Sequence, residues 1–179
     1  MKLYHYVAKP NTVLKEGILS FAQNPSADLR YYFKRSEETT HDGIIKWMEA
    51  CFKGRSRGVR AFTEPIKWSK NSLSLKKFID NADLFSIDLD ALDKDGLLDA
   101  VYFSPSVMDV PTLKEENYCD ELLIRLYDYK DIKVRPVDWT VCNDELGRRF
   151  AFVPYYVIVI KGGVIAPKYL ILEDDCHQK

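Results

Sequence analysis

The most β-prone stretch of the chain runs from Phe150 to Ile160, and it constrains the fold more than any other feature. The ten residues 151–160, AFVPYYVIVI, are rich in aromatic and β-branched side chains, which favour extended backbone. A continuous apolar run without alternation is typical of a strand that is covered on both faces. We therefore expect a central strand here, with Pro154 at its start or at a bulge, because proline cannot donate to a β ladder.

Residues 2–22 predict a first strand followed directly by a helix. The β-prone segment 3–7 has His5 at its centre, and a turn at 9–11 follows it. Asn11 is a good N-cap, because its side-chain oxygen can accept a free N–H of the first helical turn. Gly17 costs about 1 kcal/mol relative to alanine inside a helix and is the point at which the helix could end early. The expected apolar face of this helix consists of Val13, Leu14, Ile18 and Phe21.

Later patterns complete an α+β interpretation. Helices are expected from about Thr40 to Phe52, from Pro111 with Leu126 as one of its core residues, and from Asn143. Strands are expected at 84–89, 100–103 and 164–165, with a turn at 93–96. No repeat or linker interrupts the chain, so we expect one domain over 1–172 and a flexible tail at 173–179.

The segment 59–63 predicts a strand whose two faces differ in chemistry. Side chains of a strand alternate between faces. One face therefore carries Val59, Ala61 and Thr63, and the other carries Arg60, Phe62 and Glu64. The strand follows a basic segment, KGRSRGVR at 53–60, whose glycines would let backbone N–H groups approach an anion.

Composition narrows the class of protein. With 179 residues the chain can bury a sizeable core without a disulfide or a metal. The net charge is −1, with 26 basic and 27 acidic residues, which argues against a dedicated nucleic-acid or membrane-surface protein. No apolar run is long enough for a signal peptide or a membrane span, so we expect a cytoplasmic protein without a membrane partner.

Cysteine and histidine usage predicts reduced thiols and no metal. The four cysteines, at 51, 119, 142 and 176, form no C-x-x-C pair, and there are only three histidines. This spacing fits neither a disulfide framework nor a zinc site. The oligomeric state is not predicted by any pattern in the chain.

Several segments, in this order, resemble pieces of ADP-ribosyltransferase-like domains, a group that includes DNA-modifying toxins and RNA 2′-phosphotransferases. They are the first strand with His5, the segment 59–63 ending in an aromatic and a hydroxyl residue, the strand at 84–89, and the closing segments 156–160 and 163–170. The resemblance covers most of the chain. It implies a single α+β domain with a mixed, mostly antiparallel β-sheet, split to form a cleft and flanked by helices.

The resemblance also implies NAD as the cofactor, held in a bent form in that cleft. His5 would hydrogen-bond the nicotinamide-side ribose, and an aromatic residue such as Tyr31 would stack on the nicotinamide ring. Thr63 would supply the hydroxyl at the end of the middle strand. Arg60, with Arg57 beside it, would hold the pyrophosphate by charge-assisted hydrogen bonds. The acceptor of the ADP-ribose would be a macromolecule, either protein or nucleic acid.

The chain departs from this pattern at the carboxylate. In the family a glutamate usually begins the strand that aligns with 155–160, where it favours the oxocarbenium-like state of the ribose. This chain has tyrosines at that place. The candidate catalytic residues are therefore His5, Glu64 at the end of the middle strand, and Glu145, ten residues before Tyr155.

Other interpretations stay open. The chain could be a non-catalytic protein-interaction module of the effector, phage or toxin–antitoxin type, in which His5 is a packed histidine with a backbone partner and the basic loop is solvated. RNA binding or nuclease activity through 55–60 would show affinity that falls steeply with salt. A 2′-phosphotransferase would depend instead on several arginines, for which Arg57, Arg60, Arg148 and Arg149 are available.

Overall fold

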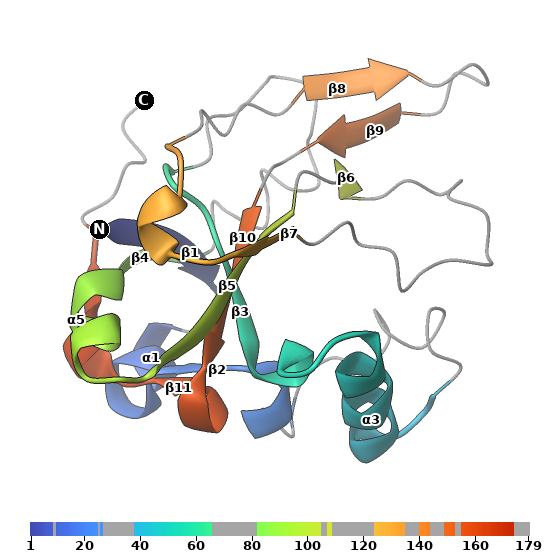
Figure 1. Cartoon of the computed structure of the whole chain (residues 1–179), viewed down its shortest axis with the longest axis horizontal. Helices are drawn as coiled ribbons and strands as arrows, with labels where there is room; N and C mark the ends of the chain where they lie inside the picture. Colours follow the sequence, from blue (N-terminus) through green and yellow to red (C-terminus); the bar gives the residue numbers. More distant parts are fainter. Residues whose placement is uncertain are drawn as a thin grey trace.

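The computed structural model describes residues 1–8, 10–24, 26, 38–65, 82–104, 107–108, 124–134, 140–143, 149–152 and 155–173. These residues form an α+β structure of antiparallel sheets with few, short helices (Figure 1). Every strand pairing among them is antiparallel. No helix within these ranges is long and apolar enough to cross a membrane.

The first sheet has three strands in the order β1-β4-β12. These are β1 (Lys2–Val7), β4 (Asp83–Asp88) and β12 (Leu170–Leu172). Leu3 of β1 pairs with Ile87 of β4, and Leu170 of β12 pairs with Ile87 from the other side. Glu173, the first residue of the expected tail, donates its N–H to the Leu84 carbonyl at 2.9 Å. The strand predicted at 84–89 is confirmed, shifted by one residue.

The second sheet has four strands in the order β3-β10-β5-β7. These are β3 (Gly58–Ala61), β10 (Tyr155–Ile160), β5 (Leu98–Ser104) and β7 (Ile124–Leu126). All six residues of β10 are buried. Alternate residues of β10 therefore enter two different cores, one on each face of the sheet. The prediction of a central strand is confirmed for 155–160.

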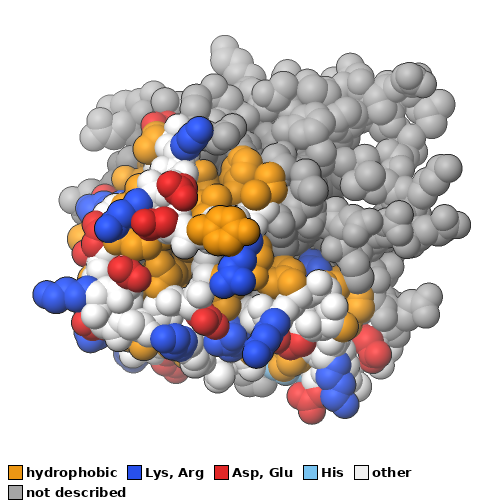
Figure 2. All heavy atoms as spheres, in the orientation of Figure 1, with side chains coloured by type: hydrophobic (Ala, Val, Ile, Leu, Met, Phe, Trp, Pro, Cys, Tyr) orange, Lys and Arg blue, Asp and Glu red, His pale blue; other side chains and the backbone are white. Residues whose placement is uncertain are grey.

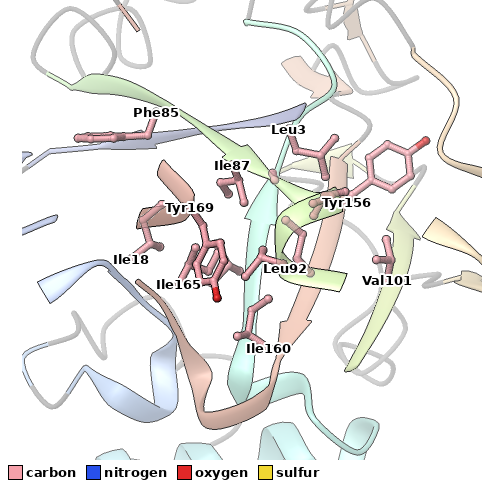
Figure 3. Packing of buried hydrophobic residues seen from close by; sticks show 14 of the residues in the cluster. Leu3, Ile18, Phe85, Ile87, Leu92, Val101, Tyr156, Ile160, Ile165 and Tyr169 are labelled. Carbon is pink, nitrogen blue, oxygen red and sulfur yellow. The ribbon is translucent and has the colours of Figure 1, made fainter. Parts of the chain in front are cut away.

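The main core lies between the two sheets (Figure 3). Leu3 and Ile87 of the first sheet and Ile158 of the second are fully buried in it. Ile18, Ile165 and Tyr169 lie close together in the same cluster. Each such aliphatic or aromatic side chain contributes roughly 1.5–3 kcal/mol when it leaves water. The shared cluster is therefore what holds the two sheets against each other.

The segment after the first strand differs from the prediction. The helix α1 (Pro10–Glu16) begins one residue before Asn11, with proline at its first position, and it ends before Gly17. The early end at Gly17 is confirmed: its φ is +82°, and its N–H closes the last turn on the Val13 carbonyl at 2.9 Å. The helical face extending to Phe21 is wrong. Three elements complete this part of the fold: β2 (Ile18–Leu19), its antiparallel partner β11 (Val164–Ile165), and the 3₁₀ helix η1 (Phe21–Gln23).

Two further α-helices begin at residues whose side chains cap them. The helix α3 (His41–Cys51) confirms the prediction for 40–52, and the Thr40 hydroxyl accepts from the Gly43 N–H at 3.0 Å. The helix α5 (Leu89–Lys94) was not predicted; the Asp88 carboxylate caps it, accepting from the Ala91 N–H at 3.1 Å. Four 3₁₀ helices complete the elements: η2 (Arg55–Arg57), η3 (Tyr129–Asp131), η4 (Lys161–Gly163) and η5 (Pro167–Tyr169).

Pairing between distant segments overturns further predictions. Leu126 lies in strand β7, not in a helix, because it pairs with Val101 of β5. Asn143 ends a strand rather than beginning a helix, because it pairs with Arg149. The predicted run 150–160 contains two strands, and the first of them belongs to a third sheet of order β6-β9-β8. These strands are β6 (Val107–Met108), β8 (Thr140–Asn143) and β9 (Arg149–Phe152).

We predict that Gly17→Ala destabilises the fold by about 1–3 kcal/mol more than Gly96→Ala. Both glycines have positive φ, +82° and +68°, so both substitutions carry the same kind of backbone strain. A Cβ at position 17 would lie 2.1 Å from the Ile165 carbonyl oxygen, whereas a Cβ at position 96 meets no atom within 4 Å. Urea unfolding of both variants measures the difference. Equal destabilisation would show that the close contact between Gly17 and β11 is not a constraint on the fold.

Candidate functional site

The two main sheets meet at one pair of residues. Tyr4 of β1 donates its N–H to the Phe62 carbonyl at 2.7 Å, and Phe62 donates its N–H to the Tyr4 carbonyl at 2.8 Å. Phe62 directly follows β3, and this is an isolated antiparallel bridge. We call this place the junction, defined by Tyr4, His5, Arg60 and Phe62. It joins two sheets that are otherwise separate in their strand pairing among the described residues.

His5 provides a second polar link at the junction. Its Nδ1 lies 2.7 Å from the Arg60 carbonyl oxygen. A carbonyl can only accept, so Nδ1 carries the hydrogen, and in the neutral ring Nε2 is left as an acceptor. Burial lowers the pKa of His5, and the hydrogen bond to Arg60 offsets only part of that effect. The imidazole is therefore neutral at pH 7.

Alternation along β1 and β3 places the predicted site residues on opposite faces. Tyr4 and Phe62 are directly paired and share one face, so His5 lies on the other face together with Leu3, toward the main core. Arg60 shares the face of Phe62, and its guanidinium lies 4.9 Å from the centre of the Tyr155 ring. The junction thus brings His5 and Arg60 together through the backbone of Arg60, while the two side chains point to different sides of the sheet.

The face that carries Arg60 is aromatic. It packs against the second core, in which Tyr155, Val157 and Val159 are buried. Tyr6 meets Phe62 edge to face, with ring centres 6.4 Å apart. Further along the sheet, the ring centres of Phe52 and Tyr102 are 4.6 Å apart. A cation held over a tyrosine ring gains about 0.5–2 kcal/mol, so Arg60 stabilises this face whether or not a ligand binds.

The other two arginines of the basic segment also contact neighbouring side chains. Arg55 is buried, with its guanidinium 4.9 Å from the centre of the Trp47 ring. Arg57 forms an ion pair with Asp99, with Nη2 and Oδ2 separated by 2.9 Å, and reaches the Ile160 carbonyl at 3.4 Å. The basic segment is therefore built into the structure and is not a solvated loop. Its arginines serve the fold in addition to any role toward an anion.

Glu49 holds this segment in place, and the sequence analysis did not single it out. Its carboxylate accepts the Gly54 N–H at 2.7 Å, the Ser56 N–H at 3.1 Å, and the Ser56 hydroxyl. Burial, the largest single effect, raises the pKa of Glu49. The hydrogen bonds from Ser56 and Gly54 and the charge of Arg57 outweigh it, so the pKa is lowered. The sequence does contain a signal for this role of Glu49. The residue lies near the end of a predicted helix, and the segment Gly-Arg-Ser-Arg at 54–57 follows that helix.

The remaining predicted residues divide into two groups. Thr63 is buried directly after the junction, and Glu64 follows it, partly exposed. Tyr155 stands where the family resemblance places a glutamate, and it is buried beneath Arg60. Tyr31 and Glu145 lie outside the described residues. The described ranges also contain no cluster of three or more histidine, cysteine or acidic residues that could hold a metal.

A pocket of about 340 Å³ lies elsewhere, between α5, the start of β5 and the chain that leaves β7. Its walls carry both charge signs, among them Asp93, Asp99, Arg125 and Lys130. None of the predicted site residues within the described ranges lines it. Figure 2 shows the same mixture over the described part of this face, where acidic and basic side chains surround an apolar area. This agrees with the balanced net charge of the chain.

Comparison with known proteins adds no relative: no family model matches the chain, and no curated protein or solved structure matches it either.

We predict that Glu49→Gln destabilises the protein by about 1–2 kcal/mol at pH 7. Because the folded pKa of Glu49 lies below its ordinary 4.5, its stabilising effect is complete above that value and is lost as pH falls through the folded pKa. The difference between parent and variant should therefore shrink below about pH 4.5. Urea unfolding at several pH values measures it, and Glu16→Gln, at an exposed carboxylate in the last turn of α1, is the control. A difference that does not change with pH would contradict the proposed role of the carboxylate.

Proposed function

We propose that the chain is an NAD-dependent protein of the ADP-ribosyltransferase-like kind, and that it binds NAD at the junction, where the His5 side chain is partly exposed. The observation that carries this proposal is the bond from His5 Nδ1 to the Arg60 carbonyl. It orients a neutral imidazole on the first strand, next to the bridge that joins the two sheets. A histidine on the first strand of a split sheet is what the resemblance predicts.

The chemistry of His5 fits the ribose. With its hydrogen on Nδ1, the ring offers Nε2 as an acceptor, which is what a ribose hydroxyl needs. Thr63, which directly follows the junction residue Phe62, adds a hydroxyl that can both donate and accept. These two side chains would orient the sugar, and the partly exposed carboxylate of Glu64 directly follows Thr63.

The arginines fit the pyrophosphate less well. Arg60 points to the face opposite His5 and covers Tyr155, and Arg57 is paired with Asp99. For either to hold a phosphate on the His5 side, it would have to leave its present partner. The proposal therefore rests on the ribose contact and assigns no described cation to the pyrophosphate.

The reaction would separate nicotinamide from the ribose and transfer ADP-ribose to a protein or nucleic-acid acceptor. Bound NAD supplies the scissile glycosidic bond. The contribution of this chain would be to orient the ribose through His5 and to place a carboxylate near the sugar as positive charge develops. Glu64 is the candidate among the described residues. Glu145 is the other candidate and is proposed from the sequence alone.

Tyr155 favours a second candidate function, a non-catalytic interaction module. A buried tyrosine beneath Arg60 occupies the start of the strand where the resemblance expects a glutamate. A cleft without that carboxylate could still bind a nucleotide or contact a partner protein. Nicotinamide release separates the two functions, because only the transferase produces it.

We predict saturable NAD binding by the parent protein at concentrations up to the millimolar range, and a loss of at least about tenfold in affinity in His5→Ala. The loss corresponds to about 1.4 kcal/mol, which is the size of one hydrogen bond to a polar ligand group. Isothermal calorimetry measures the binding, and chromatography detects nicotinamide. His41→Ala is the control, because His41 also contacts a backbone carbonyl, that of Phe21 at 2.8 Å, but stands apart from the junction.

The outcomes separate the two candidate functions. Nicotinamide release that is abolished by Glu64→Gln or by Glu145→Gln would identify the carboxylate. Binding that is sensitive to His5→Ala but gives no nicotinamide would favour the non-catalytic module. No binding by a folded parent at millimolar NAD would reject the proposal for the junction.

A further inference from the structure

We propose that the junction is an acid-sensitive latch: uptake of a proton by His5 releases the Tyr4–Phe62 pair and parts the two sheets at this end. The latch requires neither NAD nor any other ligand. It consists of the His5 ring, the Arg60 carbonyl that this ring contacts, and the Tyr4–Phe62 pair beside it.

Few hydrogen bonds join the two sheets at the junction. Among the described residues, the backbone link consists of the two hydrogen bonds between Tyr4 and Phe62, and Arg60 supplies the next acceptor on this strand. That acceptor is taken by the imidazole of His5. A buried carbonyl without a donor costs about 1–3 kcal/mol, so loss of the His5 contact would weaken the pair beside it.

The surroundings of His5 do not suit a charged ring. In β1 it shares the inner face with Leu3 and Val7, and its cross-strand partner in β4 is Phe85, which is fully buried. Protonation would leave Nδ1 bonded to Arg60 but would place a new N–H and a full positive charge at Nε2. Opening of the junction would let the ring turn toward water and hydrate that charge, at the cost of its hydrogen bond to the Arg60 carbonyl.

Within the part of the chain that the structure describes, no charged group is found to relieve this cost. In β4, Asp83 and Asp88 lie opposite Val7 and Lys2, at the two ends of β1. On β3, the Arg60 side chain points to the other face, and Glu64 lies beyond the end of the strand. Burial and the hydrogen bond to Arg60 account for the lowered pKa of His5, with no contribution from a charged side chain of the described residues.

Proton linkage gives the expected size of the effect of pH on the opening of the junction. Below the ordinary pKa of 6.5, the ring of an opened junction binds a proton that the closed junction excludes. The equilibrium constant for opening should therefore rise by up to about tenfold for each pH unit between 6.5 and the lowered pKa of His5. Above pH 6.5 both states are neutral, and opening should not depend on pH.

Hydrogen exchange of the Tyr4 and Phe62 amides tests the latch. NMR would follow these amides from pH 7.5 to pH 5.0, with rates expressed as protection factors so that the intrinsic pH dependence of exchange cancels. Protection should be constant above pH 6.5 and fall below it. The amides of Val101 and Ile158, which belong to the paired strands β5 and β10, should keep their protection.

Two variants make the test specific. His5→Asn keeps an N–H donor close to the position of Nδ1 and cannot titrate, so protection at the junction should lose its pH dependence. His41→Gln removes another histidine and should leave the dependence unchanged. A parent whose junction protection is constant down to pH 5.0, or an equal decline in His5→Asn, would overturn the latch.

A direct titration covers the case in which His5→Asn does not fold. The imidazole carbon signals of His5 in the parent report its pKa in the intact protein. A pKa below 6.5, with the same midpoint as the fall in junction protection, supports the latch. A pKa at or above 6.5 overturns it.

Discussion

The arrangement of the two main sheets depends on the contacts that join them at the junction. Tyr4 of β1 and Phe62, which follows β3, form one isolated bridge between the two sheets, and both sheets contribute large apolar side chains to a shared core. Beside this single bridge, the backbone N–H and C=O groups of the two segments do not pair with each other and need other partners. The imidazole of His5 meets the Arg60 carbonyl and closes the ladder at the point where backbone pairing stops. The same residue therefore satisfies the backbone and presents a ring nitrogen beside the bridge.

The arginines between α3 and the end of β3 are held by contacts within the fold. Arg55, Arg57 and Arg60 lie within six positions, and each is held by an aromatic ring or a carboxylate. Glu49 gathers the turn between α3 and β3 through three hydrogen bonds. Such an arrangement makes the basic segment a rigid connection between a helix and the edge of the sheet. A ligand that used these arginines would compete with contacts that the fold already makes.

Part of this structure follows from sequence pattern alone. The central strand at 155–160, the capped helix at 41–51 and the alternating faces of β3 were predictable because hydrophobic period and capping are local properties. The short strand after Gly17 and the strand containing Leu126 were not, because each exists only through pairing with a distant segment. In the candidate site, the sequence identified His5 and Arg60. It could not show that they lie on opposite faces, since that follows from the pairing of Tyr4 with Phe62.

The position of β10 in the sheet has a consequence for how the chain acquires its fold. This strand stands between β3 and β5, yet it comes after both of them in the sequence, and Val157 pairs with the distant Arg60. Until β10 arrives, β3 and β5 each have an edge with unpaired N–H and C=O groups, a known template for pairing with other chains. Non-local pairing of this kind slows folding, since a long loop must close before the contacts form. During synthesis the second sheet therefore has to wait for its central strand, and the nascent chain is most prone to aggregation in that interval.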